Sequence, residues 1–207
     1  REEQPWQSRA TLFLDNRLRA HRGQGIASSL EAAVSTTASI AVHLSLRGFT
    51  VRLVTASGED PSSAWHFRDA ELNTGPLMET LAVVQADPRP RIDTGWLAEP
   101  THGGLMVAVV GSLDPGDAPV LRRMQHHSAS AMAIALDVEA WVARSTDGGA
   151  ATALTRQGWR AAALGPRDRL DSVWQELGRS TAQVSRSGHA FTPDEMSFGP
   201  ARNGAAT

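Results

Sequence analysis

The chain has 207 residues, a hydrophobic fraction of 41% and a formal net charge of −2. This length fits one ordinary domain, and the charge balance argues against a general nucleic-acid binder, which presents a strongly basic face. Because the chain has no cysteine, disulfide frameworks and cysteine-ligated metal sites are excluded. No stretch reaches the ~18–20 apolar residues that a membrane span needs. The chain begins at Arg1 without a signal pattern, which favours a fragment whose membrane anchor, if any, lies upstream.

The first third of the chain predicts a strand, a helix and a second strand. Residues 11–15 form a short apolar run that ends in an acid. A helix is expected over residues 26–47, where Ser28 and Glu31 form a capping box and Gly48 follows as a left-handed cap. Thr50–Thr55 reads as the next strand. Together these elements make a βαβ unit with parallel strands.

The rest of the chain repeats this alternation of strands and helices. The elements expected are an edge strand at 64–67, a helix at 76–86, a helical turn at 93–99, a strand at 105–111, a helix at 117–127, a strand at 131–137, a helix at 149–157, a strand at 159–164 and a last helix bearing Leu170, Val173, Trp174 and Leu177. The predicted fold class is therefore α/β, with a doubly wound, mostly parallel sheet between two layers of helices, as in Rossmann-like proteins. We expect one domain over residues 1–187 and a flexible tail over 188–207.

The loop after the first strand carries an acid and three arginines, namely Asp15, Arg17, Arg19 and Arg22. Open α/β sheets bind ligands where the carboxyl ends of neighbouring strands diverge, so this loop is a candidate site. One interpretation is a solvated loop in which Arg17 or Arg19 pairs with Asp15. The other is a guanidinium cluster that binds a carboxylate or phosphate through forked hydrogen bonds.

A nucleotide site in this loop is disfavoured. The stretch Gly23-Gln24-Gly25 is superficially similar to a dinucleotide fingerprint, but it lies too far from the end of the strand to hold a pyrophosphate. The chain also has no lysine for a P-loop and no Gly-x-Ser-x-Gly nucleophile elbow. We therefore assign no catalytic residue and no cofactor.

A second candidate loop follows the buried strand at 105–111. It contains Ser112, Asp114 and Asp117, and both acids can reach the crevice beside Asp15. Three carboxylates there are able to hold Mg²⁺. The alternative is a simple turn in which Asp117 caps the next helix. Asp137, at the end of the next strand, allows the same two interpretations.

Residues 1–60 resemble a known bacterial family. The segments are Arg-Glu-Glu-Gln-Pro-Trp, a strand ending Leu-Asp-Asn-Arg, Ser-Ser-Leu-Glu-Ala-Ala-Val-Ser, and Arg-Gly-Phe-Thr-Val-Arg-Leu-Val-Thr. They are similar to the C-terminal region of proteins in domain of unknown function family 58, which looks like a von Willebrand factor A domain. The element order stays consistent with this family to about residue 180.

The resemblance implies a metal-dependent binding site that this chain has altered. Such domains hold a metal through Asp-x-Ser-x-Ser, a threonine and a later acid. Asp15 matches the first position, but Arg17 and Arg19 stand at the two serine positions. Thr74 is the counterpart of the threonine, and Asp114 is the acid nearest to the expected one. Because guanidinium groups repel a cation, we expect no bound metal, and we expect Arg17 or Arg19 to grip a partner carboxylate instead.

The resemblance also implies a context. Members of the family are anchored in the bacterial membrane upstream of this domain, which faces the cytoplasm, and they accompany MoxR-type AAA+ ATPases. The leading hypothesis is a non-enzymatic protein-binding module that docks a partner at the rim formed by 15–22, Thr74 and 112–117. Two alternatives stay open: a nucleotide-binding or hydrolytic enzyme, and a structural scaffold with a vestigial crevice.

Overall fold

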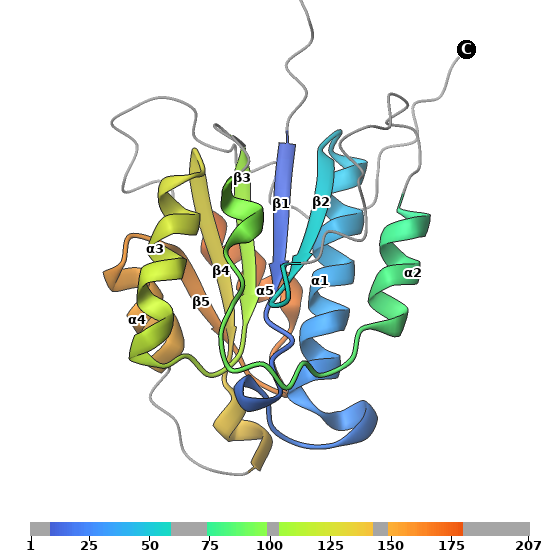
Figure 1. Ribbon diagram of the computed structural model, residues 1–207. Coiled ribbons are helices and arrows are strands. Elements are labelled where there is room, and N and C mark those ends of the chain that lie inside the picture. Colours follow the sequence, from blue (N-terminus) through green and yellow to red (C-terminus); the bar gives the residue numbers. More distant parts are fainter. Residues whose placement is uncertain (1–8, 59–73, 99–103, 143–148, 180–207) are drawn as a thin grey trace, which may run out of the picture.

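The molecule is built around one five-stranded parallel sheet. The computed structural model describes residues 9–58, 74–98, 104–142 and 149–179 (Figure 1). The strand order is β2-β1-β3-β4-β5, and every neighbouring pair runs parallel. The strands are β1 (Arg9–Leu14), β2 (Thr50–Thr55), β3 (Leu105–Val110), β4 (Ser130–Leu136) and β5 (Arg160–Leu164). This order is that of a doubly wound α/β fold, as the sequence predicts.

Helices cover both faces of the sheet and bury a separate core on each. The helices are α1 (Ser29–Leu46), α2 (Gly75–Val83), α3 (Ala118–His126), α4 (Gly149–Arg156) and α5 (Leu170–Arg179). Side chains of α1, α2 and α5 share one core with Leu12, Leu53 and Val107 of the sheet. Those of α3 and α4 share the other core with Phe13 and Ala108. Successive strand residues point to opposite faces, so β3, which is buried on both faces, is apolar throughout.

The bounds of the elements agree with the sequence pattern to within a few residues. Ser28 accepts a hydrogen bond from the backbone N–H of Glu31, which is one half of the predicted capping box; the Ser28 N–H donates to the Gly25 carbonyl instead of to Glu31. Gly48 has a φ of 81°, as the predicted left-handed cap requires. The clearest difference is α2, which ends at Val83 rather than near residue 86. The segment after it leaves the helix early because its backbone bonds to the exit of β1, through Asp87 N–H to the Asn16 carbonyl.

Two sequence predictions lie outside the described residues: the edge strand at 64–67 and the tail over 188–207. In the part of the chain that is described, none of the helices combines the length and the hydropathy needed to cross a bilayer.

The strand order fixes where a site can form. From β1 the chain passes through α1 to β2 on one side, whereas from β3 it passes through α3 to β4 on the other. The connections that leave β1 and β3 therefore diverge, and a crevice opens between the carboxyl ends of these adjacent strands. The residues after β1 and the residues after β3 meet at this point (Figure 1).

Candidate functional site

A fully buried arginine lies between two carboxylates at this switch point. The side chain of Arg17 is 0% exposed, as is that of Asp15, and that of Asp117 is 5% exposed. The Nε and Nη2 atoms of Arg17 donate to the two oxygens of Asp15 at 2.8 and 2.7 Å. Its Nη1 and Nη2 atoms donate to the two oxygens of Asp117 at 2.7 and 3.1 Å. One guanidinium thus binds a carboxylate from each side of the crevice.

The hydrogen-bonding capacity of Arg17 is used completely. A guanidinium has five N–H groups, and four of them donate to Asp15 and Asp117. The fifth, on Nη1, donates to the carbonyl of Pro90 at 3.1 Å. Arg17 therefore has no N–H left for another molecule, and no part of its side chain reaches the surface.

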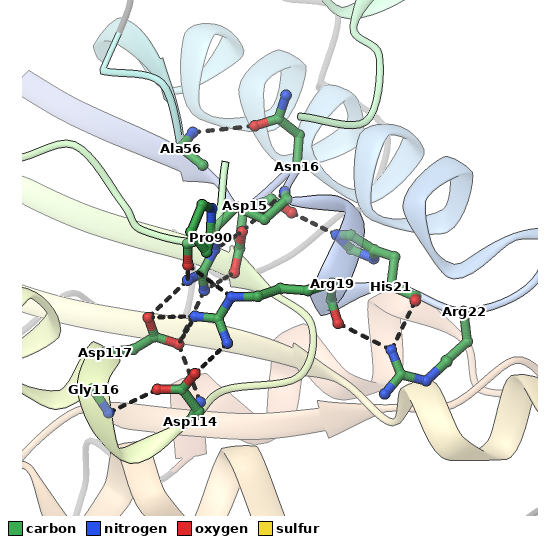
Figure 2. Close-up of polar contacts among 11 residues, drawn as sticks. Asp15, Asn16, Arg19, His21, Arg22, Ala56, Pro90, Asp114, Gly116 and Asp117 are labelled. Carbon is green, nitrogen blue, oxygen red and sulfur yellow. Dashed lines mark hydrogen bonds and ion pairs between the residues drawn. The ribbon is translucent and has the colours of Figure 1, made fainter. Parts of the chain in front are cut away.

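Arg19 forms a second, outer layer of the same charge cluster. Its Nη2 atom donates to both oxygens of Asp117 at 2.9 and 3.0 Å, and its Nε atom donates to the Pro90 carbonyl at 2.7 Å. Its Nη1 atom pairs with Asp114, whose side chain is 51% exposed. From the interior outward the charges alternate: Asp15, Arg17, Asp117, Arg19, Asp114. Figure 2 shows Arg19 reaching across to Asp114 and Asp117.

The electrostatics of the cluster favour the ionised forms of Arg17 and Asp117. Burial acts to lower the pKa of Arg17, but its hydrogen bonds and its attraction to Asp15 and Asp117 outweigh burial and raise the pKa. Burial acts to raise the pKa of Asp117, and the hydrogen bonds from Arg17 and from the Asp114 backbone outweigh it, so this pKa is lowered. A fixed cation and a fixed anion are therefore held against each other.

The segment that follows α2 completes the site, and the sequence pattern gave no sign of it. Asn16 donates from its side-chain amide to the Gln85 carbonyl at 2.8 Å, and its side-chain oxygen accepts from Ala56 N–H. The backbone N–H of Leu18 donates to the carbonyl of Asp87. These bonds hold the segment against the exit of β1 and bring the Pro90 carbonyl to Arg17 and Arg19. Figure 2 shows Pro90 beside Arg19.

The loop between β1 and α1 is fixed by His21, Ser29 and Arg22. The Nε2 atom of His21 is 2.5 Å from the Asp15 carbonyl, and its Nδ1 atom is 3.1 Å from the Ser29 hydroxyl, which also accepts from Arg22 N–H. A neutral ring with its proton on Nε2 satisfies all three bonds. The guanidinium of Arg22 donates to the carbonyls of Arg19 and His21 and pairs with Glu139 at 3.3 Å.

The exit of β3 touches this loop closely. The backbone N–H of Ser112 donates to the Ala20 carbonyl at 2.8 Å. A Cβ on Gly111 would lie 2.0 Å from that same oxygen, so only glycine fits there. This close approach explains why glycine stands at the end of β3, where the resemblance leads one to expect an acid.

Most of the candidate residues gather in one place. Asp15, Arg17, Arg19, Asp114 and Asp117 form one cluster, and Ser112 and Arg22 lie beside it. The Asp117 side chain accepts no capping hydrogen bond from α3; its carboxylate faces the arginines and accepts from Asp114 N–H. Of the two interpretations of the first loop, Asp15 does pair with Arg17, but in the interior rather than in solvent.

Two candidates lie elsewhere. Thr74 immediately precedes α2, whose first turn is at the amino edge of the sheet, whereas the cluster is at the carboxyl edge (Figure 1). It therefore does not contribute to the cluster. Asp137 lines a separate cavity of about 210 Å³ with Ser112 and Glu139.

The residues present do not fit a divalent cation. The space between Asp15 and Asp117 is filled by the Arg17 guanidinium, which bonds both carboxylates at ion-pair distance. Among the described residues, no group of His, Asp or Glu side chains is arranged to hold a metal ion. A cation entering beside Asp114 would face the positive charge of Arg19.

No protein-family model matches this sequence, and no curated protein is recognisably similar to it.

Proposed function

We propose that this chain is a non-enzymatic protein-binding module of the von Willebrand factor A-like kind, in which Arg17 stands in the position of the divalent cation. The observation that carries the proposal is the complete use of the Arg17 guanidinium by Asp15, Asp117 and Pro90 inside the protein. The guanidinium joins the two strand exits as a metal ion would, without depending on any ion in solution.

The outer layer of the cluster is the proposed contact for a partner. Arg17 is buried and has no free N–H donor. Of the two arginines, only Arg19 reaches the surface, with a side chain 33% exposed. Its Nη1 atom has one N–H beyond the pair with Asp114, and this group is available to a carboxylate on the partner. The exposed half of Asp114 offers an acceptor beside it. A rigid, charged rim of this kind favours specificity over raw affinity.

The cluster gives no support to a catalytic role. Its buried charged groups, Asp15, Arg17 and Asp117, are bonded to one another, and both ring nitrogens of His21 are engaged with Asp15 and Ser29. Within the described part of this edge, no nucleophile is paired with a free base. A module that binds its ligand without transforming it needs neither a nucleophile nor a base.

The wider context of the proposal rests on the resemblance to domain of unknown function family 58. In that context the chain is part of a larger bacterial protein, anchored in the membrane by another segment and facing the cytoplasm. Its partner is then another protein, and the first one to test is a MoxR-type AAA+ ATPase. Neither a nucleic acid nor a small-molecule cofactor is part of this proposal.

The test is a binding measurement between the 207-residue chain and a MoxR-type ATPase from the same genome, by biolayer interferometry. We expect binding that is equal in EDTA and in millimolar Mg²⁺, and at least about tenfold weaker for Arg19→Glu, since a lost charge-assisted contact is worth about 1.5–3 kcal/mol. The control is Arg169→Glu, which changes the charge equally in a residue that precedes α5. Binding that requires Mg²⁺, or that Arg19→Glu leaves unchanged while the protein stays folded, would overturn the proposal.

A further inference from the structure

A group of unpaired arginines lies on the outer surface of α3 and α4, away from the site described above. Neither helix contains an Asp or a Glu. The inward residues Leu121, Met124 and Leu154 are buried in the core, whereas Arg122, Arg123, His126 and Arg156 are exposed. We call these four exposed residues the α3–α4 basic surface.

The two helices bring these residues together. A Cβ on Gly158, two residues after α4, would lie 3.5 Å from Nε2 of Gln125 on α3, so the carboxyl ends of the helices adjoin. Figure 1 shows α3 and α4 on the same face of the sheet. Arg122 and His126 are four residues apart and Arg123 and His126 three, which places them on neighbouring positions of one helix surface.

The arginines of this surface have no counter-ion among the described residues, whereas several other arginines at the surface are paired. Arg19, Arg89 and Arg169 each pair with an aspartate. Across the residues that the structure describes, the side chains of Arg122, Arg123 and Arg156 make no ion pair and no hydrogen bond. The partial negative charge at the ends of α3 and α4 favours cations there, but it does not use their N–H groups. The guanidinium groups of these three arginines thus face the solvent.

We propose that the α3–α4 basic surface is a second docking site, and that its ligand is an acidic segment of a partner protein. Guanidinium groups bind carboxylates bidentately, and a helix of nine residues is only about 13 Å long, which matches a short acidic segment. An anionic membrane is generally recognised by clusters of about 4–8 basic side chains, more than the three arginines here. A nucleic acid favours a domain pI above about 9, whereas this sequence has a pI of about 6.4.

The test compares two variants with the same change in charge. One carries Arg122→Glu, Arg123→Glu and Arg156→Glu; the matched control carries Arg167→Glu, Arg169→Glu and Arg179→Glu, three exposed arginines in and just before α5. The probe is a labelled helical peptide rich in Glu, measured by fluorescence anisotropy at low salt. Single-stranded DNA and phosphatidylserine vesicles serve as competing ligands.

We expect the wild-type chain and the α5 control to bind the peptide, and the α3–α4 variant to bind it at least about tenfold more weakly. Circular dichroism and thermal unfolding establish that both variants are folded. Failure of the wild type to bind the peptide, equal losses in both variants, or tighter binding of DNA or vesicles than of peptide would overturn the proposal. Because the variants leave Arg19 and Arg17 unchanged, this result is independent of the proposed function of the carboxyl edge.

Discussion

A buried arginine is costly at the scale of a single residue, because its charge leaves water for a medium of low polarity. Here the cost is offset by two carboxylates and five hydrogen bonds to Arg17. The composition of the loops predicted which residues gather, since Asp15 and Asp117 follow adjacent parallel strands. It did not predict that Arg17 points inward and Arg19 outward, since both guanidinium groups bond the Pro90 carbonyl, which a distant segment supplies.

His21 should make the stability of the protein depend on pH near neutrality. Burial lowers its pKa below the ordinary value of 6.5. The unfolded chain therefore binds a proton at a higher pH than the folded chain does. The free energy of unfolding is greatest above the ordinary pKa of 6.5 and decreases as the pH falls below it. The lowered pKa of Asp117 acts in the same direction but below its ordinary value of 3.8.

The measurement is urea unfolding of the wild-type chain and of His21→Gln between pH 7.5 and 5. We expect the wild type to lose stability as the pH falls and the variant to lose clearly less. His126→Gln, on the exposed surface of α3, is the control for replacing a surface imidazole by an amide. An equal slope in wild type and His21→Gln would mean that another group controls stability in this range.

At the scale of elements, the site depends on how closely the β1–α1 loop lies against the end of β3. The loop has two one-turn helices, η1 (Leu18–Ala20) and η2 (Gly25–Ala27), and its backbone bonds to Ser112 and to Asp87 on either side. Asp15 N–H also donates to the Val109 carbonyl and extends the pairing of β1 with β3. The loop is thus a built structure rather than the solvated connection that its polar composition suggests.

Gly111→Ala should disrupt this contact. A methyl group there would lie 2.0 Å from the Ala20 carbonyl, which is backbone and has little room to move. We expect a loss of about 1–3 kcal/mol in the free energy of unfolding, the usual range for overpacking. Gly75→Ala is the control, because nothing lies near its Cβ position, and it should leave stability unchanged or slightly higher. A Gly111→Ala protein as stable as wild type would show that the loop can move away without cost.

At the scale of the whole molecule, the order of strands and helices was predictable because each element has a clear pattern. The apolar run of β3, the Ser28 cap of α1 and the left-handed Gly48 are local signals, and the structure confirms them, although the Glu31 half of the capping box does not form. Long-range contacts were not predictable from such signals. The place of Thr74 depends on the direction in which α2 runs, and the end of α2 depends on the bonds between Asn16 and the segment after Val83.

The central claim is that Arg17 serves as the resident cation between Asp15 and Asp117, and thermal unfolding in EDTA and in millimolar Mg²⁺ or Mn²⁺ tests it most directly. The wild-type midpoint should be the same in all three solutions. The variant Arg17→Ser with Arg19→Ser should be less stable in EDTA, because removing one partner of a buried ion pair costs about 3–5 kcal/mol. If the metal is present at a hundred times its dissociation constant, it should restore about 2.7 kcal/mol to this variant, a rise of about 5–10 °C.

Arg17→Lys, which keeps a cation at the same position, provides a second folded protein for comparison and should not respond to metal. A wild-type midpoint that rises by several degrees in Mg²⁺ and returns in EDTA would contradict the claim, since a metal would then bind beside the guanidinium. The claim would be contradicted equally if the double-serine variant were as stable as the wild type in EDTA, or if no metal raised its unfolding midpoint. Equal wild-type midpoints together with a metal-responsive variant are the result that the buried arginine predicts.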